Sequence, residues 1–261
     1  KLCEAEGPLL NVSWEERLEE IRVHILGTVQ LEILQELMAE RFRRKIRVGE
    51  CQVSYRETIG NTVLGCGHFE PLRHYAEVHL ALSPGKRGSG ITFESKCPFD
   101  QLDRSYQNLI QTHVFERELR GVLVGAPLTD VRVTLLAGKA HEKHTVGGDF
   151  REAVYRALRQ GLMQAESILL EPWYAFRIQA DSRQLGRILS DIQRLQGVFE
   201  PPRQQENRVT VNGRGPAAGF INYSRELAAF TKGKGMFSFR FDGYEPCQNQ
   251  EELAARFSYD P

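Results

Sequence analysis

Hydrophobic and polar residues alternate along several short stretches of the chain, a pattern typical of strands that bury one face. It predicts two strands within residues 9–25, separated by an acidic turn. Apolar residues then recur every three or four positions from Leu31 to Phe42, which predicts an amphipathic helix. Two stretches that follow are expected to be extended, at 46–48 and 52–58.

The middle of the chain predicts strands and helices joined by two polar loops. The predicted strands lie at 75–82, 91–95 and 131–135, and the predicted helices at 100–119 and 149–167. Asp100 and Asp149 are each suited to cap the helix that follows. The first loop, 83–90, is rich in glycine and carries two cations, and the second, 137–148, is polar throughout.

The last third predicts elements in the order β-α-β-β-α-β, which is the split βαβ unit of ferredoxin-like domains. The predicted strands are 173–180, 198–202, 208–211 and 236–241, and the predicted helices are 181–193 and 217–229. A short helical stretch near 251–257 follows.

Composition bounds the number of domains and the class of protein. The chain has 261 residues, more than the ~100–150 of one ordinary domain, so two or three small domains are expected. Hydrophobic residues make up 41% and charged residues 26%, which is typical of a folded globular protein. Basic and acidic residues both number 34, so a uniformly basic nucleic-acid binder is excluded, whereas one basic tip on a neutral body is not.

Cysteine usage and hydropathy indicate a cytoplasmic protein. The five cysteines are odd in number and widely scattered, which favours reduced thiols over a disulfide framework. Apolar runs all fall short of the roughly 20 residues that a membrane-spanning helix needs, and the first residues lack a signal-peptide pattern. A membrane partner is therefore not expected.

Four sequence strings carry a family resemblance. GTVQLEILQELMAERF (27–42) is similar to a domain III helix, and VSYRETI (53–59) is similar to the junction into domain IV. LLEPWYAFRI (169–178) and INYSRELAAFTKGKGMFSFRFDGYEP (221–246) are similar to the start and end of domain V. In this order and spacing, they make the chain resemble the C-terminal body of a translational GTPase of the elongation factor G and tetracycline ribosomal-protection family.

The resemblance implies an α+β protein of three small domains. Residues 1–57 would form an incomplete ferredoxin-like domain III, and residues 58–169 a ribosomal-protein-like βαβ domain IV that reaches the decoding site. Residues 170–261 would form a ferredoxin-like domain V. A Gly-Gly-Arg-Gly-Gln-Tyr-Gly stretch, expected in elongation factor G proper, is absent, while GSGITFES and DRSYQNLI look more like the tetracycline-protection branch. A translocation factor of the elongation factor G type is the alternative.

The chain lacks the phosphate-binding loop of a GTPase. GKAHEKHT (138–145) holds a Gly-Lys pair, but without the first glycine and the hydroxyl residue that follows the lysine in such a loop. The fragment is therefore expected to be a binding module with no catalytic residues and no cofactor. The resemblance implies that GTP and Mg²⁺ belong to the parent protein, and that the partner is the ribosome, through ribosomal RNA of both subunits. A monomer is expected.

The loop between the predicted strand at 131–135 and the next helix is the main candidate site. The resemblance implies that it forms the tip of domain IV and contacts RNA, through phosphates or by stacking on bases. Its candidate residues are Lys139, His141, Glu142, Lys143, His144 and Thr145. From the residues alone, a solvated connection with incidental charge is the alternative interpretation.

Two further groups of residues are candidates for ribosome contact. Lys86 and Arg87 lie between glycines that would let the backbone approach a phosphate, although a plain hairpin loop explains them equally well. The resemblance implies that Tyr223, Arg225 and Lys232 of domain V face the large subunit.

The cysteines and histidines of the central region are candidates for a metal site or a catalytic site. Four of them fall within fourteen residues: Cys66, His68, His74 and His79. Their spacing lacks the paired pattern of structural zinc sites, and nothing in the sequence orients a base for a nucleophilic cysteine. No metal is predicted, and an enzyme that uses these residues is the competing hypothesis of another class.

Overall fold

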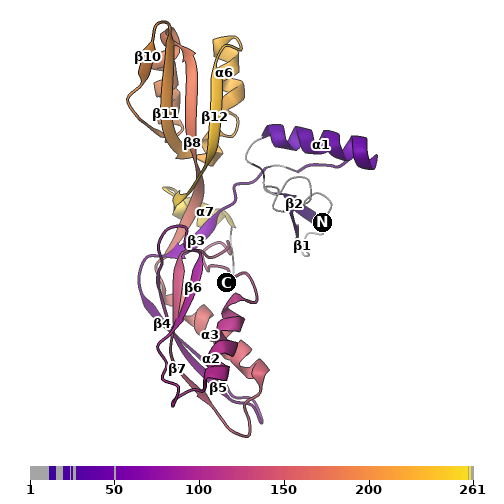
Figure 1. Ribbon diagram of the computed structural model, residues 1–261, viewed down its shortest axis with the longest axis vertical. Coiled ribbons are helices and arrows are strands. Elements are labelled where there is room, and N and C mark those ends of the chain that lie inside the picture. Colours follow the sequence, from indigo (N-terminus) through magenta and orange to yellow (C-terminus); the bar gives the residue numbers. More distant parts are fainter. Residues whose placement is uncertain are drawn as a thin grey trace. The chain divides into compact units, whose positions relative to one another are not determined.

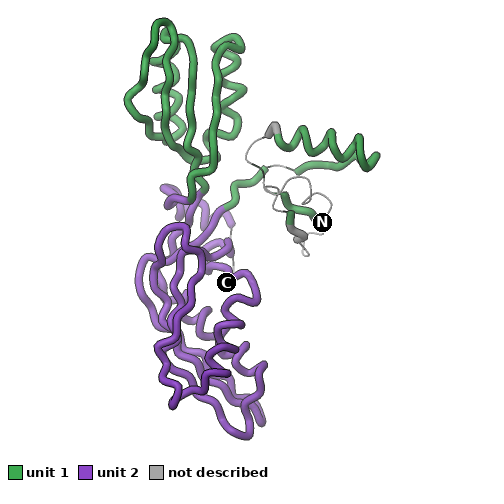
Figure 2. Tube along the Cα trace, viewed as in Figure 1, with its two compact units in different colours: residues 1–54, 172–243 green, residues 55–171, 244–261 purple. Residues whose placement is uncertain are grey.

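The computed structural model describes residues 12–15, 20–23, 25, 28–49, 51–257 and 259. The chain divides into two compact units, shown in different colours in Figure 2. Unit 1 comprises residues 1–54 and 172–243, and unit 2 comprises residues 55–171 and 244–261. Both contain helices and sheets, so the predicted α+β class is confirmed.

Unit 2 is built on a four-stranded sheet with two helices on one face (Figure 1). The strand order is β4-β5-β7-β6, in which β6 and β7 are parallel and the other pairs antiparallel. The elements are β4 (Val63–Phe69), β5 (Ala76–Pro84), β6 (Ile91–Ser95), α2 (Arg104–Phe115), β7 (Val131–Ala140) and α3 (Gly147–Gln164). Its core lies between this sheet and the two helices, and includes Leu80, Ile110, Leu135 and Phe150.

Helix α3 approaches the backbone of β4 very closely. Gly65 and Gly67 are the positions of β4 that face the helix. A Cβ atom on Gly65 would lie 2.0 Å from the carbonyl oxygen of Ala157, and one on Gly67 would lie 1.7 Å from that of Ala153. Because such separations are far below van der Waals contact, only glycine allows this packing.

The hydrophobic pattern does not predict β4, and the predicted cap of α2 is wrong. Three glycines, a cysteine and a histidine among the residues 60–68 conceal the hydrophobic alternation that marks a strand. The cap of α2 is Asp103, whose side chain accepts a hydrogen bond from the Ser105 N–H, and not Asp100. This helix also ends at Phe115, before the predicted limit at Leu119.

The start of α3 also differs from the prediction. Asp149 does not precede the helix but lies in its first turn, where its carboxylate accepts a hydrogen bond from the Val146 N–H at 2.9 Å. It therefore still satisfies a backbone donor at the helix N-terminus, as a capping box does. The helix ends at Gln164, and residues from Ser167 onward already belong to a strand.

A buried carboxylate fixes the long connection between α2 and β7. Glu57, in β3 (Arg56–Ile59), is fully buried. Its side chain accepts hydrogen bonds from the backbone N–H groups of Leu123, Val124 and Ala126, at 2.8, 3.0 and 2.9 Å. These three donors satisfy a group that would otherwise be very costly to bury.

β3 is antiparallel to the first residues of β8 (Ser167–Asp181), and the later residues of β8 pair with β11 of unit 1. In unit 1 the strand order is β10-β11-β8-β12, with β9 also paired to β11. When the four strands of this path are numbered in chain order, from β8 as strand 1 to β12 as strand 4, their order in the sheet is 2-3-1-4. This is the order of a ferredoxin-like sheet, as predicted. The remaining elements are α4 (Leu185–Arg194), β9 (Val198–Phe199), β10 (Arg203–Gln205), β11 (Arg208–Pro216), α5 (Ala217–Phe220), α6 (Tyr223–Thr231) and β12 (Met236–Pro246).

The single helix predicted at 217–229 is wrong, because α5 and α6 are separate helices. Phe220 and Tyr223 on either side of the break are both fully buried and pack edge to face, with ring centroids 5.8 Å apart. The break therefore directs two large aromatic side chains into the same core.

Near the N-terminus, a hairpin and a helix confirm three predicted elements. They are β1 (Val12–Glu15), β2 (Glu20–Val23) and α1 (Thr28–Phe42). The predicted first strand began before Val12, at residues that lie outside the described part of the chain. The short helix predicted near the C-terminus is also present, as α7 (Gln250–Phe257), and it clusters with unit 2. The three predicted domain boundaries stay a prediction.

Replacing Gly67 with Ala is expected to lower the free energy of unfolding by at least about 2 kcal/mol, because α3 must move away from β4. Urea unfolding followed by circular dichroism measures this change. Gly148→Ala is the matched control, since a Cβ there would meet nothing within 4 Å and alanine favours a helix, by up to about 1 kcal/mol. Equal losses in the two variants would contradict the close-packing argument.

Candidate functional site

The predicted tip loop connects β7 to α3 at one end of unit 2 (Figure 1). The strand is longer than predicted, so Lys139 lies in β7, and the loop itself runs from His141 to Val146. Lys139 is exposed, and its ammonium group lies 5.9 Å from the centroid of the Tyr75 ring. The loop begins and ends on two elements of the core, which is the arrangement that positions a binding loop on a rigid scaffold.

Hydrogen bonds from the backbone and from Thr145 hold the loop in one shape. The Thr145 hydroxyl donates to the Tyr75 carbonyl at 2.6 Å and accepts from the His141 N–H at 2.7 Å. The Tyr75 N–H donates to the His144 carbonyl at 3.1 Å. Thr145, predicted to contact RNA, is therefore used to anchor the loop, and its hydroxyl group is already satisfied within the protein.

The side chains at the tip of this loop point into solvent. His141, Glu142, Lys143 and His144 are all exposed. The two imidazole rings stack on each other, with centroids 4.5 Å apart and planes inclined by 28°. The loop thus presents a flat aromatic surface beside a lysine, which are groups that recognise unpaired bases and phosphates.

A second loop, 70–74, lies beside the tip loop and was not predicted as part of the site. The Tyr75–His144 backbone hydrogen bond joins the two loops. Leu72 is 91% exposed, and Arg73 is exposed with a positive φ of 65°. A fully exposed leucine next to an arginine at a loop tip is a stronger sign of binding than either residue alone, and it could have been noticed in the string EPLRH.

A hydrogen bond between a half-exposed histidine and a buried aspartate fixes the base of this second loop. His74 Nδ1 lies 2.8 Å from a carboxylate oxygen of Asp149, whose side chain is 4% exposed. The other carboxylate oxygen accepts the Val146 N–H. One aspartate therefore ties the 70–74 loop to the first turn of α3.

The predicted second contact, at Lys86 and Arg87, lies at the other end of β5. The nine residues of this strand separate it from the tip loop by roughly 26 Å. The carboxylate of Asp130 accepts hydrogen bonds from the N–H groups of Gly88 and Gly90, both at 3.0 Å, which fixes the loop. Arg87 forms an ion pair with Glu245, and Lys86 is exposed. These cations and the tip loop therefore do not form one site.

The three candidates in unit 1 have different environments. Tyr223 is fully buried in an aromatic core, and burial raises the pKa of its hydroxyl group, so the prediction that it faces a partner is corrected. Arg225 forms an ion pair with Glu32 of α1 at 2.9 Å. Lys232 is exposed, with φ at 53° in the left-handed turn that ends α6.

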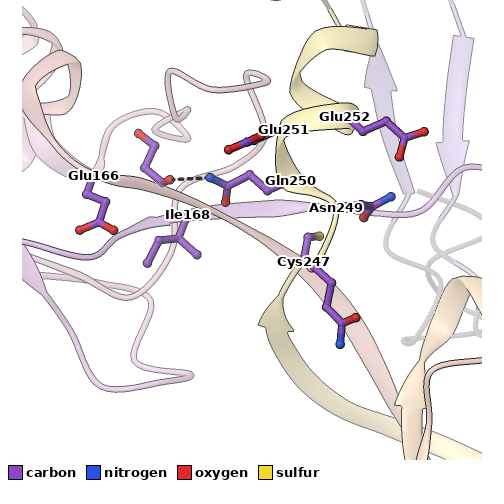
Figure 3. A pocket seen from close by; sticks show the side chains of 9 residues that line it. Glu166, Ile168, Cys247, Asn249, Gln250, Glu251 and Glu252 are labelled. Carbon is purple, nitrogen blue, oxygen red and sulfur yellow. Dashed lines mark hydrogen bonds between the residues drawn. The ribbon is translucent and has the colours of Figure 1, made fainter. Parts of the chain in front are cut away.

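A hollow of unit 2 lies between the start of β8 and α7 (Figure 3). It has a volume of about 550 Å³ and includes three carboxylates, those of Glu166, Glu251 and Glu252. The Gln250 side chain closes one side by donating to the Ser167 carbonyl at 3.2 Å. Its acidic lining does not favour an RNA phosphate, so this hollow is not part of the candidate site.

Of the cysteine and histidine residues in the central region, Cys66 and His79 are brought together on β4 and β5. Cys66 Sγ lies 3.8 Å from His79 Nε2, and the same nitrogen lies 2.6 Å from a carboxylate oxygen of Glu77. His74 and the His141–His144 pair lie elsewhere, at the loops. The sequence spacing did not reveal this cluster because it forms across two paired strands.

The four-stranded α+β unit and the ferredoxin-like sheet follow one another along one chain. Two family models match the chain: elongation factor G, domain IV, over residues 51–166, and elongation factor G C-terminus, over residues 168–253. The chain belongs to the elongation factor G family.

Similar curated proteins come from two branches of this family. The chain is 28% identical over 263 residues to the tetracycline resistance protein TetP of Clostridium perfringens, covering all of this chain and 40% of TetP. It is also 28% identical over 249 residues to elongation factor G 2 of Syntrophus aciditrophicus (strain SB), covering 94% of this chain and 37% of that factor. The chain therefore spans about two fifths of the length of these relatives.

A solved structure has the same fold. A crystal structure of a protein from Thermus thermophilus matches 99% of this chain and 39% of its own, with a TM-score of 0.80 and 24% identity. In the part of the chain that the model describes, no helix is long and apolar enough to cross a membrane.

Replacing Thr145 with Val is expected to loosen the tip loop, because the His141 N–H loses its acceptor and the Tyr75 carbonyl its donor. The free energy of unfolding should fall by about 1 kcal/mol, and the His141 amide should exchange faster with solvent. Hydrogen exchange read by NMR measures both loops at once. Thr92→Val, at an exposed position of β6, is the control, and equal exchange at His141 in the two variants would contradict the anchoring role.

Proposed function

We propose that this chain is the ribosome-binding part of a tetracycline ribosomal-protection protein. In this proposal the tip of unit 2 enters the decoding site of the small ribosomal subunit and contacts RNA there, which displaces the drug. The protein acts in the cytoplasm as a monomer. GTP and Mg²⁺ bind to a domain that this chain does not include, and hydrolysis allows the factor to leave the ribosome.

The observation that carries the proposal is the anchored tip loop. Its scaffold contacts are made by backbone groups and by Thr145, while His141, Lys143 and His144 remain exposed. Of the two rings, only that of His141 is used within the loop, where its Nδ1 accepts the Lys143 N–H at 3.2 Å, so the Lys143 ammonium group and the His144 ring stay available for a partner. The cost of ordering is met during folding, so less free energy is lost on binding.

The chemistry of the tip favours RNA over a protein partner. The exposed fixed cations are Lys139, Lys143 and Arg73, against the carboxylates of Glu70 and Glu142. The stacked imidazoles add a flat surface on which a base can lie, and Leu72 adds an apolar contact. Cations for phosphates combined with rings for bases are the usual means of binding single-stranded RNA.

A translocation factor is the second candidate, because elongation factor G 2 and TetP are equally similar to this chain. Both kinds of factor would use the tip at the same place on the ribosome. They differ in what the full-length protein does. A protection factor restores translation in the presence of tetracycline, whereas a translocation factor supports elongation when the drug is absent and no other translocase is supplied.

Replacing Lys143 with Glu in the full-length protein is expected to weaken ribosome binding and to reduce the rescue of tetracycline-inhibited translation. The loss should be larger at low salt, because a lysine–phosphate contact acts through counterion release. The melting temperature should hardly change, since an exposed loop charge alters stability by no more than about 0.5 kcal/mol.

The control is Lys96→Glu, which reverses a charge on the same unit at a side chain that is 68% exposed and belongs to neither loop; its ion-pair partner is the neighbouring Glu94, at 3.5 Å. Lys96→Glu is expected to retain binding and rescue. Full activity in both Lys143→Glu and a variant with glycine at all of 141–144 would rule out the tip as the contact. Elongation activity without any rescue would favour the translocation factor instead.

A further inference from the structure

The open face of the β4–β5 pair carries a block of side chains that bind metals. Cys66 is paired directly with His79, and His68 directly with Glu77, in the antiparallel register. Residues two apart on a strand point to the same side, so these four side chains share one face. It is the face opposite α3, because Gly65 and Gly67 are the residues of β4 that face the helix.

Three of the four side chains bring their ligand atoms together. One ligand atom from each of Cys66, Glu77 and His79 lies within 4.8 Å of the other two, and His79 Nε2 is close to both of its partners. The distance of 3.8 Å from Cys66 Sγ to His79 Nε2 is close to the ~3.6 Å that separates sulfur and nitrogen around a tetrahedral zinc ion. His68 is not part of this group, and its Nε2 lies 2.9 Å from Glu70, outside the cluster.

From this geometry we infer that Cys66, Glu77 and His79 form a binding site for a zinc ion. A thiolate and a carboxylate balance the two positive charges of Zn²⁺, and the imidazole completes three protein ligands. Sulfur and nitrogen ligands select zinc over Mg²⁺ or Ca²⁺, which prefer oxygen. The fourth position is left to water, which can reach it because the side chains of His79 and Glu77 are 42% and 28% exposed.

A hydrogen bond from a neighbouring side chain orients one of the ligands. The Tyr75 hydroxyl donates to one carboxylate oxygen of Glu77 at 2.9 Å, which orients the carboxylate, and a zinc ion would replace the hydrogen bond between the other oxygen and His79 Nε2. Zinc binding forms the Zn–S bond to Cys66 and releases the proton of its thiol.

A zinc ion at this place would join the two strands that support the 70–74 loop. That loop carries Leu72 and Arg73 and lies beside the tip loop. The site is independent of the proposed function, because its ligands come from the two strands and from neither loop.

The test uses Co²⁺ as a spectroscopic substitute for zinc in full-length protein that has been stripped of metal. One equivalent of Co²⁺ is expected to give a thiolate-to-cobalt absorption band together with the intense visible bands of tetrahedral cobalt. Added Zn²⁺ should remove both. Zinc should also raise the melting temperature by mass action, and its affinity should fall as pH is lowered, because protons compete for Cys66.

Two variants and one control decide the assignment. Cys66→Ser is expected to lose the thiolate band, and His79→Gln to bind zinc at least about tenfold more weakly. Both should keep the metal-free melting temperature of the parent, which separates loss of a ligand from loss of folding. Cys51→Ser, at an exposed free cysteine, should behave as the parent. No thiolate band in the parent, or a band that persists in Cys66→Ser, would overturn the proposal.

Discussion

Helix α3 lies directly on the backbone of β4, because the two positions of this strand that face the helix carry no side chain. This contact fixes how deeply the helix sits on the sheet, and the turn before the helix is the tip loop. It also sends every side chain of β4 that could take part in chemistry to the opposite face of the sheet. The placement of the loop and the composition of the open face therefore both depend on Gly65 and Gly67.

Much of the fold follows from local pattern. The alternation in β5 and the start of β7, and the periodicity of α1 and α4, were sufficient to predict these elements, because their apolar residues repeat at the spacing of the structure that they form. The strand β4 could not be predicted in this way. Its two central core-facing positions are glycines, so the middle of the strand packs through its backbone, and only Val63 and Phe69 at its ends add hydrophobic side chains to the core.

The candidate site was predicted less completely than the fold. The position of the tip loop was expected, but its division into anchoring and exposed residues was not, since Thr145 and Lys143 are both polar loop residues in the sequence. Tyr223 shows the opposite error, because a helix surface and a helix core cannot be told apart near a break between two helices. The Cys66–His79 pair depends on strand register, which residue spacing along the chain does not reveal.

The way in which the tip loop is held also bears on how such a protein changes over evolutionary time. Its shape depends on Thr145 and on backbone groups, while the neighbouring positions from Glu142 to His144 face solvent. Substitutions at these positions would alter what the loop recognises without placing the fold at risk. A lineage could therefore move from one ribosomal task to another by changing a few exposed residues, with the framework beneath them left intact.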